Sequence, residues 1–305
     1  MNILKTLCSI HSPSGEEFRM KEFLVDYINS SKYWWKKKPK LIYGKEFQDN
    51  LIVVFGKPKV AFIAHMDTVG YTVRYNKEII PIGTPVNETG DILQGQDSIS
   101  EIECLVHKNS EEYNLSYIYK RLIQTGTSLT FKPDFRVTED MIQTPYLDNR
   151  LSVWILLKIA ETMSNGILVF SSWEEHGGGS VEFLTKYLYE RFNIKQTIIA
   201  DTTYVSEGIE HDKGTVISLR DAYIPRKLFV DKIKNIAIEN NIKHQLEVEY
   251  SGGSDGASVQ KSPYPVDWCF VGLPISNIHS PDEIVNKNDI FATIKLYQKI
   301  MSNLQ

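Results

Sequence analysis

The sequence predicts an α/β protein with a mostly parallel sheet flanked by helices, and with a small β-rich domain inserted into it. Before residue 70 and after residue 148, short apolar strand-like segments alternate with helical patterns. Between these positions, short alternating segments are punctuated by Gly, Asn and Asp, and no long amphipathic pattern is evident. The length of 305 residues is at or beyond the limit of one hydrophobic core, which favours two domains.

The N-terminal part is predicted to contain one helix followed by two strands. Residues 14–17 match the S-x-x-E capping box of a helix start. Apolar residues then recur at helical spacing over 20–28. The runs 51–55 and 60–64 are β-branched or aromatic-rich, as expected for strands that are buried on both faces.

The part after residue 148 alternates between helices and strands. Helices are predicted over 151–163, 180–192, about 225–240 with Pro225 in the first turn, and from 289 onward; strands are predicted over 167–173, 197–200 and 266–271. This alternation indicates a largely parallel sheet that is covered on both faces. The predicted division is residues 1–69 with 147–305 for the α/β domain, and 70–146 for the insert.

Composition and charge exclude several classes of protein. The formal net charge of -4 argues against a nucleic-acid partner. No apolar run approaches the roughly 18 residues that a membrane-spanning helix needs, and the N-terminus lacks the pattern of a signal peptide. The 3 cysteines are far apart and form no CxxC pair, which fits a reducing compartment. We therefore expect a cytoplasmic protein without a nucleic-acid or membrane partner.

Histidine and acidic residues follow the ends of the predicted strands. They are His65 with Asp67, Asp148, the pair Glu174 and Glu175, Asp201, and His279. Each alone is more often structural, but ligands of open α/β sheets bind beyond the carboxyl ends of the strands. An unpaired charge after an apolar strand would be costly. Imidazole nitrogens and carboxylate oxygens bind divalent zinc, and a carboxylate can bridge two ions. The sequence therefore predicts a metal site.

The segments that carry these residues resemble, in their order, the co-catalytic metallo-aminopeptidases of the glutamyl aminopeptidase and tetrahedral aminopeptidase family. They are Ala64-His65-Met66-Asp67, Leu147-Asp148-Asn149-Arg150, Trp173-Glu174-Glu175-His176-Gly177, Ile199-Ala200-Asp201 and Ile278-His279-Ser280-Pro281-Asp282-Glu283. The segments 12–16, 49–53 and 252–255 add support, and the resemblance covers almost the whole chain. It implies a zinc-exopeptidase-like fold, peptide substrates with a free N-terminus, and a homo-oligomer that is assembled through the insert.

The resemblance also implies a ligand set for two divalent ions per subunit, zinc or cobalt. His65 and Asp201 would bind one ion, Glu175 and His279 would bind the other, and Asp148 would bridge both. The implied reaction is removal of the N-terminal residue of a peptide by a water that bridges the two metals.

Two further residues receive catalytic roles from the resemblance. Glu174 would be the general base that deprotonates the water. Asp67 would orient the ring of His65, because residues two apart on a strand point the same way and carboxylates commonly hold zinc-binding histidines. His176 stands where the family has a small apolar residue, and we expect it to have a surface or hydrogen-bonding role.

The position of the insert separates this family from its relatives. The interval between Asp67 and Asp148 is long enough for a domain, whereas related di-zinc carboxypeptidases and deacylases carry their extra domain in the interval before the last histidine. A carboxypeptidase or deacylase, which acts on substrates with a blocked amino group, is one alternative. A metal-binding assembly protein that has lost catalysis is the other, although such a scaffold has no need of Glu174 and Asp67.

Overall fold

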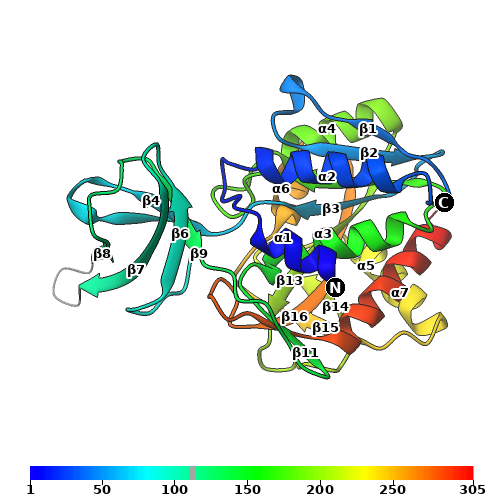
Figure 1. Ribbon diagram of the computed structural model, residues 1–305. Coiled ribbons are helices and arrows are strands. Elements are labelled where there is room, and N and C mark those ends of the chain that lie inside the picture. The colour runs from blue at the N-terminus through cyan, green and yellow to red at the C-terminus, as the bar shows by residue number, and fades with distance from the viewer. Residues whose placement is uncertain (110–113, 305) are drawn as a thin grey trace.

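The computed structural model describes residues 1–109 and 114–304, and its larger sheet is parallel at the centre (Figure 1). The central strands lie in the order β12 (Gly166–Ser171), β3 (Ala61–His65), β13 (Gln196–Tyr204) and β16 (Asp267–Ser276). Each of these neighbours is paired in parallel. Because parallel strands end at the same edge, the residues that follow them meet there.

The flanks of this sheet are antiparallel. On one side lie β2 (Leu51–Phe55) and β1 (Lys40–Ile42); on the other lie β17 (Ile284–Asn286), β11 (Met141–Gln143) and β10 (Arg136–Val137). A branch pairs β14 (Thr215–Arg220) with β16, and β15 (His244–Val248) with β14. The predicted α/β fold with a mostly parallel central sheet is confirmed, and the antiparallel flanks add to it.

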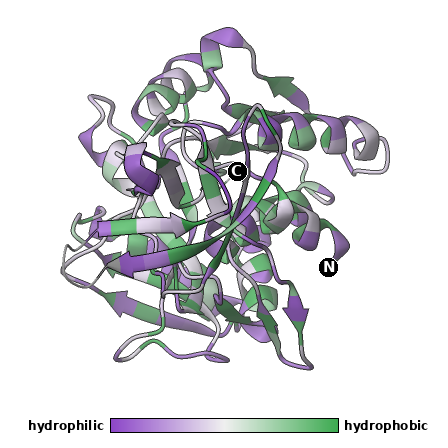
Figure 2. Ribbon diagram, turned by 60° about the vertical axis from the view of Figure 1, so that its left-hand side comes forward, coloured by the Kyte–Doolittle hydropathy of each residue, from purple (hydrophilic) through white to green (hydrophobic). Residues whose placement is uncertain are grey.

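Helices cover both faces of the larger sheet. One face packs against α1 (Asn2–Ser9), α2 (Phe18–Ser31), α3 (Leu147–Ala160), α5 (Lys227–Glu239) and α7 (Lys287–Asn303). The other face packs against α4 (Val181–Phe192) and α6 (Asp255–Lys261). Along β2, Leu51 and Val53 belong to the first core and Ile52 to the second, as alternation along a strand requires. Figure 2 shows helices of mixed hydropathy.

The insert forms a separate antiparallel sheet that projects from the main body (Figure 1). Its order is β5 (Ile79–Ile82), β4 (Gly70–Val73), β9 (Ser128–Phe131), β6 (Ile92–Gln96), β7 (Glu101–Asn109) and β8 (Asn114–Ile118). Tyr71, Leu129 and Phe131 lie in its own core. The expected insert runs to residue 146, but β10 and β11 already pair with the larger sheet, so the separate sheet occupies 70–131.

Two predictions about helix starts were wrong. The N-cap of α2 is Glu17, without a side-chain capping bond, and Ser14 donates to Asp67 instead. Pro225 precedes Arg226, the N-cap of α5, and is not in the first turn. Short 3-10 turns lie at Lys45–Phe47 and Tyr75–Lys77. Within the described residues, no helix combines the length and the apolar character that crossing a membrane requires.

Candidate metal centre and active site

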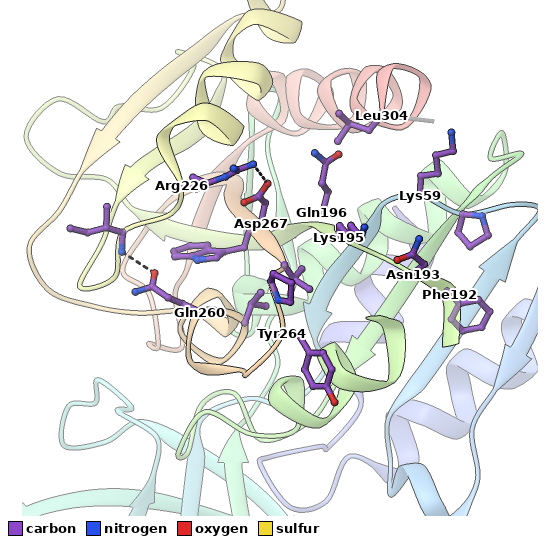
Figure 3. Close-up of a pocket in the computed structure, with 16 residues that line it drawn as sticks. Lys59, Phe192, Asn193, Lys195, Gln196, Arg226, Gln260, Tyr264, Asp267 and Leu304 are labelled. Carbon is purple, nitrogen blue, oxygen red and sulfur yellow. Dashed lines mark hydrogen bonds and ion pairs between the residues drawn. The ribbon is translucent and has the colours of Figure 1, made fainter. Parts of the chain in front are cut away.

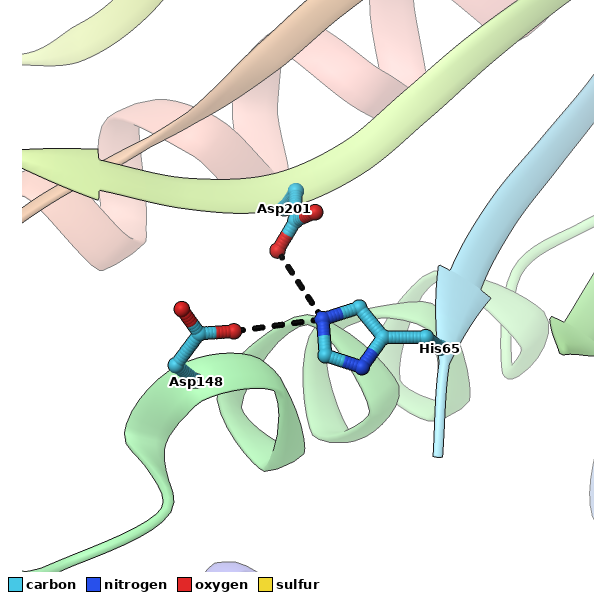
Figure 4. A group of neighbouring side chains, drawn as sticks. All are labelled: His65, Asp148 and Asp201. Carbon is cyan, nitrogen blue, oxygen red and sulfur yellow. Dashed lines mark ion pairs between the residues drawn. The ribbon is translucent and has the colours of Figure 1, made fainter. Parts of the chain in front are cut away.

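The residues predicted as metal ligands come together at the carboxyl edge of the central strands. His65 is the last residue of β3, and Asp201 lies on β13. Asp148 lies at the start of α3 and faces them (Figure 4). Glu175 and His279 lie in the connections that follow β12 and β16.

His65, Asp148 and Asp201 form one group of possible ligands. The Nε2 atom of His65 lies 3.2 Å from Oδ1 of Asp148 and 3.5 Å from Oδ1 of Asp201 (Figure 4). One donor atom from each of these residues falls within 4.8 Å of the others. All three side chains are buried, so their donor atoms are held in place by the surrounding core.

Asp148, Glu175 and His279 form a second group. The Nε2 atom of His279 lies 3.1 Å from Oε2 of Glu175 and 3.5 Å from Oδ2 of Asp148. Their donor atoms again fall within 4.8 Å of one another. Asp148 therefore presents one oxygen to each group, which is the arrangement that a bridging carboxylate needs.

Negative charge exceeds positive charge in this cluster. Burial would lower the pKa of His65, but Asp201, Asp148 and Asp67 raise it well above its usual value. Burial would also lower the pKa of His279, but the carboxylates of Asp148 and Glu175 raise it to about 12. Burial raises the pKa of Glu175 to about 7. These shifts show carboxylates that lack sufficient counter-charge, which bound cations would supply.

Unpartnered buried atoms and the donor chemistry fit divalent cations. Oε1 of Glu175 is buried and has no hydrogen-bond partner among the described residues, and Oδ1 of Asp148 is buried beside the Nε2 atom of His65 at 3.2 Å. Nitrogen and carboxylate oxygen donors, without a thiolate, suit zinc, cobalt and similar ions. The residues present therefore match the metal centre that the sequence predicts.

Asp67 contacts both His65 and the segment after β12 that carries Glu174 and Glu175. Its side chain is 0% exposed, and Oδ1 lies 3.4 Å from Nδ1 of His65. It accepts hydrogen bonds from the backbone N–H groups of Glu174 (3.1 Å) and Glu175 (3.0 Å), and from the hydroxyl of Ser14 (2.6 Å). Asp67 thus holds the ring and the connection in one relative position.

Two buried glutamates that the sequence-based assignment missed also position the site. Glu283 accepts from the backbone N–H groups of Asp148 (3.0 Å) and His279 (2.8 Å). Glu17 accepts from the backbone N–H of Trp173 (2.9 Å). Both are 1% exposed. Glu283 directly precedes the strand β17, whereas the positions identified from the sequence follow strands, so the same signal did not include it.

The insert contacts the candidate metal centre through the connection between β5 and β6. The Oγ1 of Thr84 lies 2.9 Å from Nδ1 of His279, and the N–H of Val86 donates to the carbonyl of His279 at 2.9 Å. The N–H of Gly83 donates to Nδ1 of the exposed His176 at 3.0 Å, which confirms the hydrogen-bonding role expected for His176. A Cβ at Gly83, whose φ is +67°, would lie 2.9 Å from the carbonyl of Glu175. The insert therefore fixes both His279 and the glutamate connection.

Left-handed backbone conformations cluster at the same place. Trp173, directly before Glu174, has φ 64°; His279 has φ 64°; and Tyr146, two residues before Asp148, has φ 71°. Such conformations cost about 1–3 kcal/mol each in non-glycine residues and persist where the surroundings impose them. Their position beside the cluster supports a functional role for it.

A cavity of about 490 Å³ opens over the cluster. It is lined by His65, Asp148, Glu174, Glu175, Asp201 and His279, and its lining also includes Asp221, Glu247 and Glu249. A larger hollow of about 970 Å³ lies at the amino ends of β13 and β16 (Figure 3). That hollow contains the Arg226–Asp267 ion pair (2.6 Å) and none of the predicted site residues. The smaller cavity is therefore the candidate active site.

Comparisons with known proteins agree with this geometry. Residues 116–296 match the family model described as M42 glutamyl aminopeptidase. A curated relative, a putative aminopeptidase of Acetivibrio thermocellus, is 23% identical, and the match covers 97% of this chain and 96% of the relative.

Solved structures share the whole fold. A TET aminopeptidase from the marine sediment archaeon Thaumarchaeota archaeon SCGC AB-539-E09 superposes with a TM-score of 0.87 at 13% identity, over 100% of this chain and 99% of the other. The TET1 peptidase of Pyrococcus horikoshii gives a TM-score of 0.82 at 22% identity, over 98% of each chain. The latter is described as assembling into a tetrahedron or a large octahedral shell.

Proposed function

Since the chain belongs to the M42 glutamyl aminopeptidase family, a family of metal-dependent hydrolases of peptide bonds, we propose that its active site is a two-cation centre that removes N-terminal residues from peptides. The observation that carries this proposal is the position of Asp148. Its two oxygens face two separate groups of ligands, at 3.2 Å from His65 and 3.5 Å from His279.

We propose that His65 and Asp201 bind one divalent ion, that Glu175 and His279 bind the other, and that Asp148 bridges both. Zinc and cobalt are the expected ions, because both accept this mixture of imidazole and carboxylate donors. Bound there, the ions would polarise the scissile carbonyl and make a neighbouring water more acidic. The chain's own residues must then position the peptide and move the proton.

Glu174 is the proposed general base. It lines the cavity, its side chain is 16% exposed, and it belongs to neither group of ligands. Its Oε2 lies 4.0 Å from Nε2 of His65, so the carboxylate lies beside the cluster at more than hydrogen-bond distance. From this position it can take a proton from the attacking water and return it to the departing amine. Asp67 holds the backbone N–H of Glu174 and thereby its orientation.

An aminopeptidase requires a free α-amino group, which gives the experiment that tests the proposal. Matched peptides with free and acetylated N-termini would be incubated with the metal-replete protein, and the products would be identified by mass spectrometry. We expect release of the N-terminal residue from the free peptide and no release from the acetylated peptide. Faster cleavage of the acetylated peptide would contradict the proposal and favour a deacylase or carboxypeptidase.

We also propose that the insert, residues 70–146, assembles the protein into a homo-oligomer in the cytoplasm. Ile92, Leu105 and Ile118 lie opposite one another across β6, β7 and β8, and are 39%, 39% and 53% exposed. Such an exposed apolar row, beside the edge strand β8, is typical of a surface that another chain covers. The cysteines Cys8, Cys104 and Cys269 are free and buried, which supports the cytoplasmic location.

Light scattering would test the role of this row. Leu105→Lys combined with Ile118→Lys should give smaller species than the wild type, because lysines in the contact would be buried without partners. Leu228→Lys, at an apolar residue that is 72% exposed on α5, serves as the control and should keep the wild-type mass. If the double variant also keeps the wild-type mass, this face of the insert does not assemble the protein.

A further inference from the structure

The connection between β5 and β6, residues 83–91, brings a side chain of the insert into the active-site cavity. Thr84 lines this cavity together with the proposed ligands, although it is a neutral residue of the insert. Its Oγ1 lies 2.9 Å from Nδ1 of His279. Within residues 1–109 and 114–304, no other side chain is bonded to that nitrogen. The contact therefore joins the insert to one proposed ligand through a single hydroxyl.

The two nitrogens of the His279 ring face different groups. Nε2 lies 3.1 Å from Oε2 of Glu175 and 3.5 Å from Oδ2 of Asp148, whereas Nδ1 faces Thr84. A neutral imidazole carries one proton, and it binds a cation through the nitrogen that lacks this proton. Nε2 can therefore bind a cation only when Nδ1 is the donor, and the hydroxyl of Thr84 lies where it accepts that hydrogen bond. Because Thr84 is exposed, solvent can accept the proton of the hydroxyl itself.

Backbone contacts fix the position of Thr84 relative to His279. The N–H of Val86 donates to the carbonyl of His279 at 2.9 Å, so the connection contacts the same residue twice. On the other side of Thr84, the N–H of Gly83 donates to Nδ1 of His176 at 3.0 Å. The two neighbouring contacts hold the backbone of Thr84 against the main body of the protein.

The core of the insert supports the same connection. Asn87 is buried, and its Nδ2 donates to the hydroxyl of Tyr71 at 2.7 Å and to the carbonyl of Pro85 at 3.4 Å. Tyr71 lies in the hydrophobic core of the insert. Pro85 directly follows Thr84 and restricts the backbone on both sides of their peptide bond. The hydroxyl of Thr84 is therefore preorganised by the insert as well as by the main body.

The histidine of the first group has a comparable contact on its far nitrogen. Nδ1 of His65 lies 3.4 Å from Oδ1 of Asp67. Such contacts orient the ring of a metal-binding histidine, and their loss commonly lowers metal affinity by about 10- to 100-fold. Asp67 is on the same segment as His65, so its role could be expected from the sequence. Thr84 has the corresponding position beside His279, although it comes from the domain that supplies no proposed ligand.

Resting on the proposed two-cation centre, we propose that Thr84 is a positioning residue for the second group of ligands. Its hydroxyl holds the ring of His279 with Nε2 toward the carboxylates of that group, and the insert thereby sets the affinity of the group for its cation. In the described part of the chain, Thr84 makes no hydrogen bond to His65 or Asp201. The affinity of the first group should therefore not depend on Thr84.

Calorimetric titration of the metal-free protein with zinc or cobalt would measure this role without a substrate. Thr84→Val keeps the shape of the side chain and removes the hydroxyl, so it should lower the affinity for one of the two ions by about 10- to 100-fold. Thr84→Ser keeps the hydroxyl and should bind both ions with affinities near the wild-type values.

Thr89→Val is the matched control. Thr89 lies in the same connection and is exposed, and its hydroxyl accepts from the backbone N–H of Lys108 at 3.1 Å, inside the insert. The same substitution at this position should leave the affinity for both ions at the wild-type value. If Thr89→Val weakens an ion as much as Thr84→Val, a general disturbance of the connection is responsible and the contact with His279 is not.

Combination with ligand variants would identify the ion that Thr84 affects. In Asp201→Asn, the second group should keep its ion, and adding Thr84→Val should weaken that ion by the same factor as in the wild type. In Glu175→Gln, the first group should keep its ion, and adding Thr84→Val should not change its affinity. The reverse pattern would overturn the inference.

The same titrations separate this inference from the proposed function. Equal affinities of the wild type and Thr84→Val, or failure of Thr84→Ser to retain the affinity, would overturn the role of Thr84 and leave the aminopeptidase proposal intact. Fewer than two ions in the wild type under saturating metal would overturn both. Selective weakening of one ion in Thr84→Val, without cleavage of any peptide that has a free N-terminus, would support the role of Thr84 and overturn the aminopeptidase proposal.

Discussion

Replacement of Glu174 by glutamine is expected to lower kcat by about 10² to 10⁴-fold, the usual contribution of a general base. Glutamine keeps the length and the hydrogen-bonding capacity of the side chain but cannot accept a proton. The backbone N–H of Glu174 would still donate to Asp67 at 3.1 Å, so the connection should keep its shape. The change in kcat corresponds to about 3–5 kcal/mol in the activation free energy.

Metal content and KM distinguish a base from a ligand. Because Glu174 lies in neither ligand group, Glu174→Gln should retain wild-type metal by elemental analysis and a KM close to that of the wild type. Glu175→Gln is the matched comparison at the adjacent position. The Oε2 of Glu175 lies 3.1 Å from Nε2 of His279, so this variant should lose or weaken one ion. The assignment is falsified if Glu174→Gln loses metal while Glu175→Gln stays fully loaded and inactive.

The main elements of the fold could be predicted because their signals are local. The runs that form β2, β3 and β12 are apolar up to the last residues of β3 and β12, His65 and Ser171, and each is buried along its whole length. Helix α4 begins and ends within one residue of the prediction over 180–192. In these segments the apolar positions in the sequence are the positions that are buried in the structure, so the pattern alone predicts the element.

The elements that the sequence did not predict depend on tertiary pairing. β15 has a mixed burial pattern and lies at an edge, where it pairs only with β14. Helix α6 has 7 residues, too few for a helical period to be read. The part of the cavity lining that contains Asp221, Glu247 and Glu249 is formed by β15 and the segments that follow β14 and β15. Its position therefore could not be predicted without those strands.

In the candidate site, too, some features follow from local sequence signals and others depend on tertiary contacts. The positions of His65 and the glutamate pair follow from the ends of apolar strands, a signal that the sequence contains directly. Asp201 lies inside β13 (Gln196–Tyr204), so the strand predicted over 197–200 was too short. The contact of Thr84 with His279 joins residues that lie 195 positions apart, and no period or motif relates them. The capping-box interpretation of Ser14 was wrong for a similar reason, because its hydroxyl donates to Asp67 across 53 positions.

Asp148→Asn is expected to remove both ions together. The carboxylate presents Oδ1 to His65 at 3.2 Å and Oδ2 to His279 at 3.5 Å, whereas asparagine keeps one acceptor oxygen and replaces the other with an NH₂ donor. Metal content should fall from about two ions per chain to less than one, because a two-metal site shares this ligand. Activity should fall with it, and elemental analysis after zinc or cobalt loading would measure the change.

Two other variants test whether the loss of both ions is specific to Asp148, the proposed bridging ligand. Asp201→Asn alters a residue of the first group only, so it should weaken one ion and leave the other bound. Asp140→Asn, at an exposed position between β10 and β11, should keep the full metal content. The fold of Asp148→Asn should persist, since the contact of this residue with Glu283 is made by its backbone N–H. One firmly bound ion in Asp148→Asn would show that the groups bind independently, and the shared-ligand proposal would then be wrong.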